Sequence, residues 1–156
     1  MRLFGGKSGL LDAIFNDTWI LLNAEISTRL HDEMNGRAAV QVAFGAIIEG
    51  LGRDPEAAIL FLFEGRRIRG RGAYVAASQG SLEFFHLIRE LVGRGQRDGS
   101  FRTDLSDAAI SSAVIGAGEG MLRDRLNAVR NGLNAPFDDA VIAHAFAAAT
   151  EGFKGS

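Results

Sequence analysis

The chain has 156 residues, a formal net charge of −2 at pH 7 and no cysteine. This length fits one domain, the near-neutral charge provides no overall field for nucleic acid or an anionic membrane, and the lack of thiols excludes disulfides, thiol catalysis and thiolate metal sites. The sequence contains neither the run of about 18 apolar residues that a membrane span needs nor a signal-peptide pattern. We therefore expect a cytoplasmic protein that does not associate with membranes.

The first two predicted helices cover about residues 8–32 and 37–51. Apolar residues recur at helical spacing along the first one, where they form a stripe and its two margins: Leu11, Phe15, Thr18, Leu22 and Ile26, with Leu10, Ile14 and Leu21 beside them. We expect Asn35 and Gly36 to end this helix, because both residue types tolerate positive φ. The second helix should end at Gly52.

A third, short helix is predicted from Asp54, which can accept hydrogen bonds at the helix start, followed by Pro55 and Glu56. It is apolar on nearly all sides, so we expect it to be buried. The basic turn RRIRGRG (66–72) follows, and then a long fourth helix over about 73–97.

The last two predicted helices follow the loop DGSFRTD. The fifth is capped by Asp104 or Ser106, runs to about Asn131 and is ended by Gly132 and Asn134. The sixth opens at 136–138 and runs to about residue 153. No segment alternates between apolar and polar residues as a strand does. The pattern predicts an all-α bundle of about six helices.

The fifth and sixth helices are built largely from Ala, Gly and Ser. Each of the glycines 116, 118 and 120 should cost about 0.5–1 kcal/mol relative to Ala inside a helix, so close packing must offset them. That packing lies either within the monomer or against the same helices of a second chain. The sixth helix has no wide charged face, which favours a homodimer. The predicted interface residues are Ala109, Ala113, Gly116, Gly120, Ala143 and Ala147.

Catalytic signatures are absent from the sequence: it has no glycine-rich nucleotide motif after a strand, no HExxH and no GxSxG. His86 and Glu90 lie four residues apart, a spacing that would suit two metal ligands but is more common for a surface ion pair or a half-buried, hydrogen-bonded imidazole. We therefore predict no enzyme activity, no metal site and no cofactor.

Aromatic residues are distributed over the first four helices and the last. Most belong in a core, but some could line a cavity between helices for a small apolar or aromatic effector, together with a few polar groups. The candidate ligand-binding residues are Trp19, Asn23, Phe44, Phe63, Tyr74, Ser78, Phe85 and Glu119.

Two segments resemble TetR-family transcriptional regulators. RLFGGKSGLLDAIF is similar to the junction between the helix-turn-helix and the first helix of the ligand-binding body, with matches at Phe4, Gly5, Gly6, Lys7 and Leu10. Ser8 stands where the family usually has an acidic residue. GSFRTDLSDAAISSAVIGAGEGML resembles the loop and dimerising helix of the same family.

This resemblance implies that residues 1–7 are the end of a recognition helix and that residues 8–156 form an effector-binding and dimerisation domain. Lys7 would contact a DNA phosphate. Met1 occupies the family's tyrosine position, and no helix-turn-helix precedes it, so DNA is an expected partner only where such a head exists. The expected function is a ligand-responsive regulator, and the alternative is a stand-alone helical ligand-binding or protein-interaction dimer.

Overall fold

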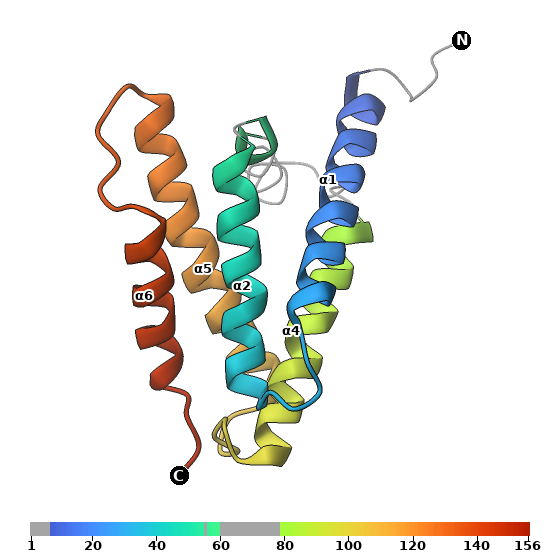
Figure 1. Cartoon of the computed structure of the whole chain (residues 1–156), viewed down its shortest axis with the longest axis vertical. Helices are drawn as coiled ribbons and strands as arrows, with labels where there is room; N and C mark the ends of the chain where they lie inside the picture. Colours follow the sequence, from blue (N-terminus) through green and yellow to red (C-terminus); the bar gives the residue numbers. More distant parts are fainter. Residues whose placement is uncertain (1–6, 55, 60–78) are drawn as a thin grey trace.

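The computed structural model describes residues 7–54, 56–59 and 79–156. Within these ranges it contains α1 (Lys7–Arg29), α2 (Gly36–Arg53), α4 (Gln79–Asp98), α5 (Asp107–Arg130) and α6 (Asp139–Glu151) (Figure 1). The described chain is all-helical, which confirms the predicted fold class. None of its helices is both long and apolar enough to cross a membrane.

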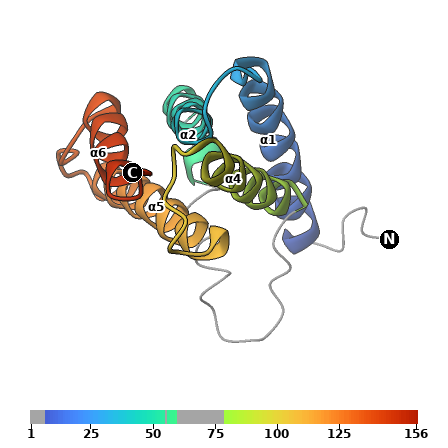
Figure 2. The ribbon, with the colours of Figure 1, turned by 90° about the horizontal axis from the view of Figure 1, so that it is seen from below.

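The helices form two layers, with α6, α2 and α1 in one and α5 and α4 in the other (Figure 2). α2 packs against α1, α4 and α6, while α5 packs against α4 and α6. α5 and α6 therefore lie on one side of the bundle, and α1 lies on the opposite side.

The connection between α1 and α2 differs from the prediction. Asn35 and Gly36 do not end α1: Asn35 is the N-cap of α2, with φ −67°, and its side chain accepts a hydrogen bond from the backbone N–H of Ala38. Gly36 is the first residue of α2 and touches α4, where an added Cβ would lie 2.2 Å from the backbone nitrogen of Gly95. A close helix approach, rather than positive φ, requires this glycine.

The predicted end of α2 at Gly52 is too early, since the helix runs to Arg53, but three other predicted caps are confirmed. Asp54 accepts from the backbone N–H groups of residues 56 and 57, and Ser106, rather than Asp104, caps α5. Gly132 follows α5 with φ +70°, which suits glycine. α6 begins later than predicted, because Asp138 is its N-cap.

The core covers one face of α1 and both sides of α2. Phe15, Leu22 and Ile26 are buried, as the stripe predicts. The expected margin of that stripe is not in the core, since the exposed fractions of Leu10, Ile14 and Leu21 are 47%, 40% and 72%. α1 lies at one edge of its layer, and among the described helices it packs against α2 and α4.

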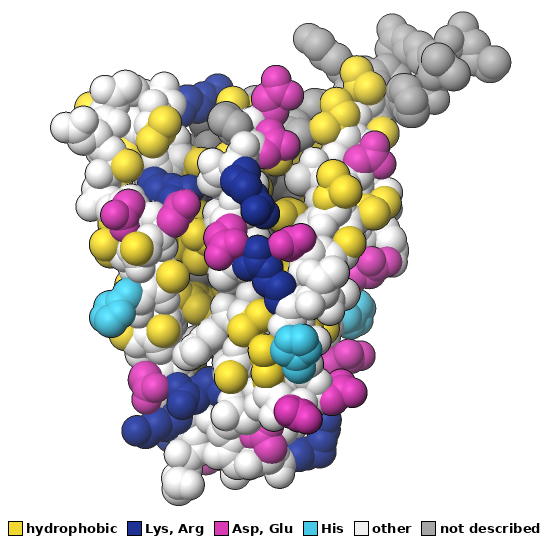
Figure 3. Space-filling model, in the orientation of Figure 1, with side chains coloured by type: hydrophobic (Ala, Val, Ile, Leu, Met, Phe, Trp, Pro, Cys, Tyr) yellow, Lys and Arg dark blue, Asp and Glu magenta, His cyan; other side chains and the backbone are white. Residues whose placement is uncertain are grey.

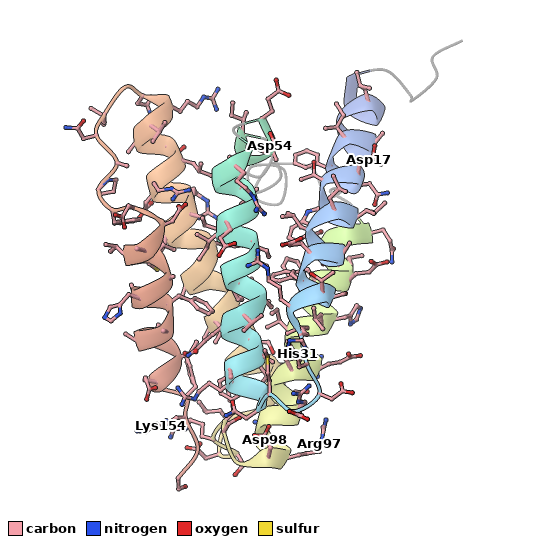
Figure 4. The ribbon with its side chains drawn as sticks, in the orientation of Figure 1. Asp17, His31, Asp54, Arg97, Asp98 and Lys154 are labelled. Carbon is pink, nitrogen blue, oxygen red and sulfur yellow. The ribbon has the colours of Figure 1, made fainter. Side chains whose placement is uncertain are left out.

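Polar contacts close the lower end of the bundle, where Figure 4 labels Asp98 and Lys154. The Asp98 carboxylate accepts from the backbone N–H groups of Gly36 and Ser100, at 2.7 and 2.9 Å. The chain end pairs with the α4–α5 loop through an isolated antiparallel bridge between Phe101 and Lys154. These contacts hold the start of α2, the end of α4 and the C-terminal tail together.

Candidate ligand site and oligomer interface

Three aromatic residues of the predicted ligand site, Trp19, Phe44 and Phe85, lie in one cluster at the centre of the bundle. Trp19 of α1 and Phe44 of α2 each lie 5.3 Å from Phe84 of α4, between ring centroids. Phe44 also lies 4.4 Å from Phe146, and Phe85 lies beside Phe84 at 6.1 Å. Trp19, Phe44, Phe84 and Phe146 are each at most 5% exposed. These rings fill the space between the helices rather than lining an open cavity.

Asn23 lies at the contact between α1 and α4. Its side-chain Nδ2 donates to the carbonyl of Gly80 at 3.0 Å, while its buried Oδ1 accepts no hydrogen bond from the described residues. The two helices approach closely here, since a Cβ at Gly80 would lie 2.1 Å from the Cβ of Trp19. A buried amide oxygen without a donor is costly, so this atom is a natural acceptor for a ligand.

Of the remaining predicted ligand residues, the structure describes Glu119 alone, and it does not join this group. Glu119 lies on α5 and pairs with Arg123, one turn further on, at 3.8 Å. Phe63, Tyr74 and Ser78 lie outside the described residues, as does most of the predicted third helix with its basic turn. Lys7, the predicted phosphate contact, is the first residue of α1.

A groove of about 320 Å³ lies between α1 and the end of α2. Its apolar wall includes the exposed Leu21, and Glu25 stands at its edge. Arg29 bonds to Glu25 at 2.8 Å and to Glu49 at 2.7 Å, so it joins the two helices. The hydrogen bond from Arg29 lowers the pKa of Glu49 despite the opposing effect of burial. This groove is a second place for an apolar molecule.

The outer side of α4 carries a charged hollow of about 600 Å³ that includes His86, Glu90 and Arg97. At its edge, Arg89 donates to Asp107, and this hydrogen bond lowers the pKa of Asp107. No group of three or more metal-ligating side chains occurs anywhere in the described part of the chain. His86 and Glu90 are both exposed on this surface.

The predicted interface residues lie on the outer side of α5 and α6. Ala109, Ala113, Gly116 and Ala143 are exposed, and Gly120 and Ala147 are half-buried. In the sequence, α5 has no charged residue between Asp107 and Glu119, and α6 has none between Asp139 and Glu151 apart from the titratable His144. We call the surface formed by these six small residues the α5–α6 face. In the space-filling view, hydrophobic side chains lie over α6 and the upper part of α1, with charged groups over α2 between them (Figure 3).

The three glycines of α5 divide into two kinds. Gly118 faces the core, where an added Cβ would lie 2.5 Å from Cε1 of Phe44. Gly116 and Gly120 face outward, and a Cβ on either would meet no described atom within 4 Å. Packing within the described chain therefore explains Gly118 but neither of its two neighbours.

Sequence reasoning missed two features of this structure. The first is that Phe84 and Phe146 complete the aromatic cluster. Their positions on the apolar stripes of α4 and α6 could have indicated that they belong to it. Arg125 is buried, with 9% exposed, and forms an ion pair with Asp139. Arg125 follows Val114, Gly118 and Leu122 at helical spacing, so the core stripe of α5 already marked it.

Comparison with known proteins supports the fold alone. No family model and no curated protein sequence matches the chain. A solved structure described as a protein with unknown function, from Rhodococcus sp. RHA1, is similar over 99% of this chain and 78% of its own, with a TM-score of 0.66 and 18% sequence identity. The class that these findings define is an all-helical bundle.

Proposed function

We propose that this chain is the ligand-sensing and dimerising body of a TetR-like transcriptional regulator. In this proposal two copies pair through the α5–α6 face, and an apolar or aromatic effector binds within the helical body. Effector binding would shift an equilibrium between two arrangements of the dimer, which an attached DNA-binding head would report.

The observation that carries the proposal is the position of Gly116 and Gly120. Two glycines in a helix interior cost about 1–2 kcal/mol together relative to alanine, and nothing in the described monomer offsets this cost. Glycine and alanine on an uncharged helix face allow two backbones to approach closely. A second copy of the same face supplies the missing contact, as in an isologous dimer.

The effector arm of the proposal is supported by Asn23. Its buried Oδ1 lies on the helix that also carries Trp19, close to the aromatic cluster. A ligand with one hydrogen-bond donor and an aromatic body would satisfy this atom.

The DNA arm rests on the sequence resemblance and on Lys7 at the start of α1. One lysine adds one phosphate contact per subunit, which supplies little affinity and no base readout. Specific DNA binding is therefore expected only where a helix-turn-helix precedes this body.

The test is the solution mass of Ala113→Arg, measured by light scattering beside the unmodified chain. Ala113 is exposed in the monomer, so the substitution leaves the fold intact and places two buried charges in the dimer. The matched control is Ala24→Arg, at an exposed site on α1. We expect a dimer for the unmodified chain and for the control, and a folded monomer for Ala113→Arg. An unmodified chain that is monomeric, or an unchanged Ala113→Arg dimer, refutes the interface.

The packed aromatic cluster favours a second candidate, a helical protein-interaction dimer without a small-molecule ligand. A thermal-shift panel of neutral aromatic compounds separates the two functions. Stabilisation that Asn23→Leu abolishes supports the regulator. A complete lack of stabilisation, with the dimer intact, supports the interaction protein.

A further inference from the structure

A groove of about 620 Å³ lies away from the predicted effector site, between the end of α2, the second half of α5 and the start of α6. Residues from these helices and from the α5–α6 connection line it, among them Gly52, Arg125, Leu126, Val129, Ala135 and Asp139. Its volume falls in the range of small-molecule sites, and its walls are mainly apolar, as in such sites. Val129, on its wall, is 60% exposed.

The polar part of the groove is the ion pair of Arg125 and Asp139. Arg125 is the single charged residue buried in the described part of the chain, and its side chain is 11% exposed. The Asp139 side chain is 46% exposed and comes from the neighbouring helix. Burying an arginine is costly, and an apolar pair of similar volume often stabilises a fold equally well. The ion pair therefore calls for a role other than stability.

Hydrogen-bonding capacity remains on both partners. A guanidinium carries five N–H donors and a carboxylate accepts several bonds, and Asp139 is the one described partner of Arg125. The end of α2 lies close to this carboxylate, since a Cβ on Gly52 would lie 2.8 Å from Oδ2 of Asp139. Asp138, at the groove edge, already accepts from the backbone N–H of Val141.

These observations select the chemistry of the ligand. The ion pair has no net charge, and the Asp138 carboxylate is compensated by the N-terminus of α6, which it caps. An ionic ligand would therefore lose its hydration without gaining an uncompensated partner charge. A neutral head that both accepts and donates can bond to both partners, with its carbonyl oxygen on Arg125 and its N–H on Asp139. The apolar walls then hold the body of the molecule.

We propose that this groove binds a neutral amphipathic small molecule whose amide-like head bridges Arg125 and Asp139. The site is independent of the proposed regulator function and of the aromatic cluster. Its occupation neither requires DNA nor involves Asn23.

The test uses three probes that share one apolar body and differ in the head: 4-phenylbutanamide, 4-phenylbutanoate and 4-phenylbutylamine. Each is titrated into the full ¹⁵N-labelled chain while backbone amide signals are followed by NMR. A probe of about twelve heavy atoms should bind with a dissociation constant on the order of a millimolar. We expect the amide to bind at least tenfold more tightly than the other two. The largest shifts should fall on residues 52, 126, 129 and 135.

Two variants complete the experiment. Ala135→Trp fills the groove from an exposed position, and Ala24→Trp is its matched control on α1. The double substitution Arg125→Met with Asp139→Leu removes both charges while keeping the side-chain volume. Amide binding should fall at least tenfold in the first and in the double variant and stay unchanged in the control. Any one of three results overturns the proposal: equal binding of the three probes, chemical-shift changes elsewhere in the chain, or unchanged amide binding in Ala135→Trp. The Ala135→Trp result is decisive even if the double variant fails to fold.

Discussion

Adding one methyl group at two neighbouring glycines of α5 should have opposite effects. In Gly118→Ala the new Cβ meets the ring of Phe44, at 2.5 Å from Cε1 and 2.8 Å from Cδ1. Carbon atoms pack at about 3.5–4.0 Å, so the ring must move by about 1 Å. Phe44 cannot turn away freely, because Phe84 and Phe146 hold it at 5.3 and 4.4 Å.

The expected change in the free energy of unfolding of Gly118→Ala is the sum of two opposing contributions. Overpacking a core costs about 1–3 kcal/mol, and replacing glycine by alanine in a helix returns about 1 kcal/mol. The free energy of unfolding of Gly118→Ala should therefore fall by about 1 kcal/mol. In Gly116→Ala the methyl group meets open space, so the isolated fold should gain about 0.5–1 kcal/mol.

The assay is urea unfolding, followed by the fluorescence of the single tryptophan. Trp19 is 5% exposed and lies against Phe84, so its emission reports the opening of the core. Both substitutions are made in the Ala113→Arg background, which we expect to be monomeric, so that dimer dissociation does not contribute. A Gly118→Ala variant as stable as its parent, or a less stable Gly116→Ala variant, refutes the packing described for α5.

Three further outcomes are expected. Gly36→Ala should destabilise the fold far more than Gly45→Ala. A Cβ at position 36 would lie 2.2 Å from the backbone of α4, whereas a Cβ at position 45 would meet no described atom within 4 Å. Equal urea unfolding midpoints of the two variants would contradict this prediction. Asn35→Ala should cost about 1 kcal/mol through the lost N-cap bond, measured by urea unfolding, and no loss would show that the cap is unimportant. Burial tends to raise the pKa of Asp98, but hydrogen bonds from Ser100 and Gly36 outweigh it and lower the pKa, so stability is lost as the pH falls below about 4. As the pH falls below about 4, the melting temperature of Asp98→Asn should fall less than that of the unmodified chain. An equal fall in both proteins would refute the role of the Asp98 carboxylate in this pH dependence.

The helices and most of their caps could be predicted from the sequence, because capping and apolar spacing act locally. The preferences of single residue types for helix ends correctly predict the caps Asp54, Ser106 and Gly132. Asn35 and Gly36 were assigned to the wrong helix, since the same residue types suit both the end of one helix and the start of the next. The contact of Gly36 with α4, which is far away in sequence, determines that Gly36 begins α2 rather than ending α1.

The candidate sites were less predictable, because they depend on which helix faces which. Spacing showed that Trp19 and Phe44 could meet, but not that Phe84 and Phe146 would fill the space around them. The small residues of α5 that were predicted to form an interface are exposed or half-buried, and Gly118, which was not among them, is buried. The sequence could not show that the Phe44 ring is what Gly118 contacts.

The most direct test of the α5–α6 face uses single cysteines, because the chain has none of its own. Cysteines are placed one at a time at positions 109, 113, 116 and 143 on this face and, as controls, at the exposed positions 24 and 90. The thiols are then joined by mild oxidation or a short bismaleimide, and covalent dimers are quantified on denaturing gels. We predict rapid cross-linking at the positions on the face that lie nearest the two-fold axis of the dimer, and none above the collision rate at the controls. Equal rates at both sets of positions would contradict a dimer through α5 and α6.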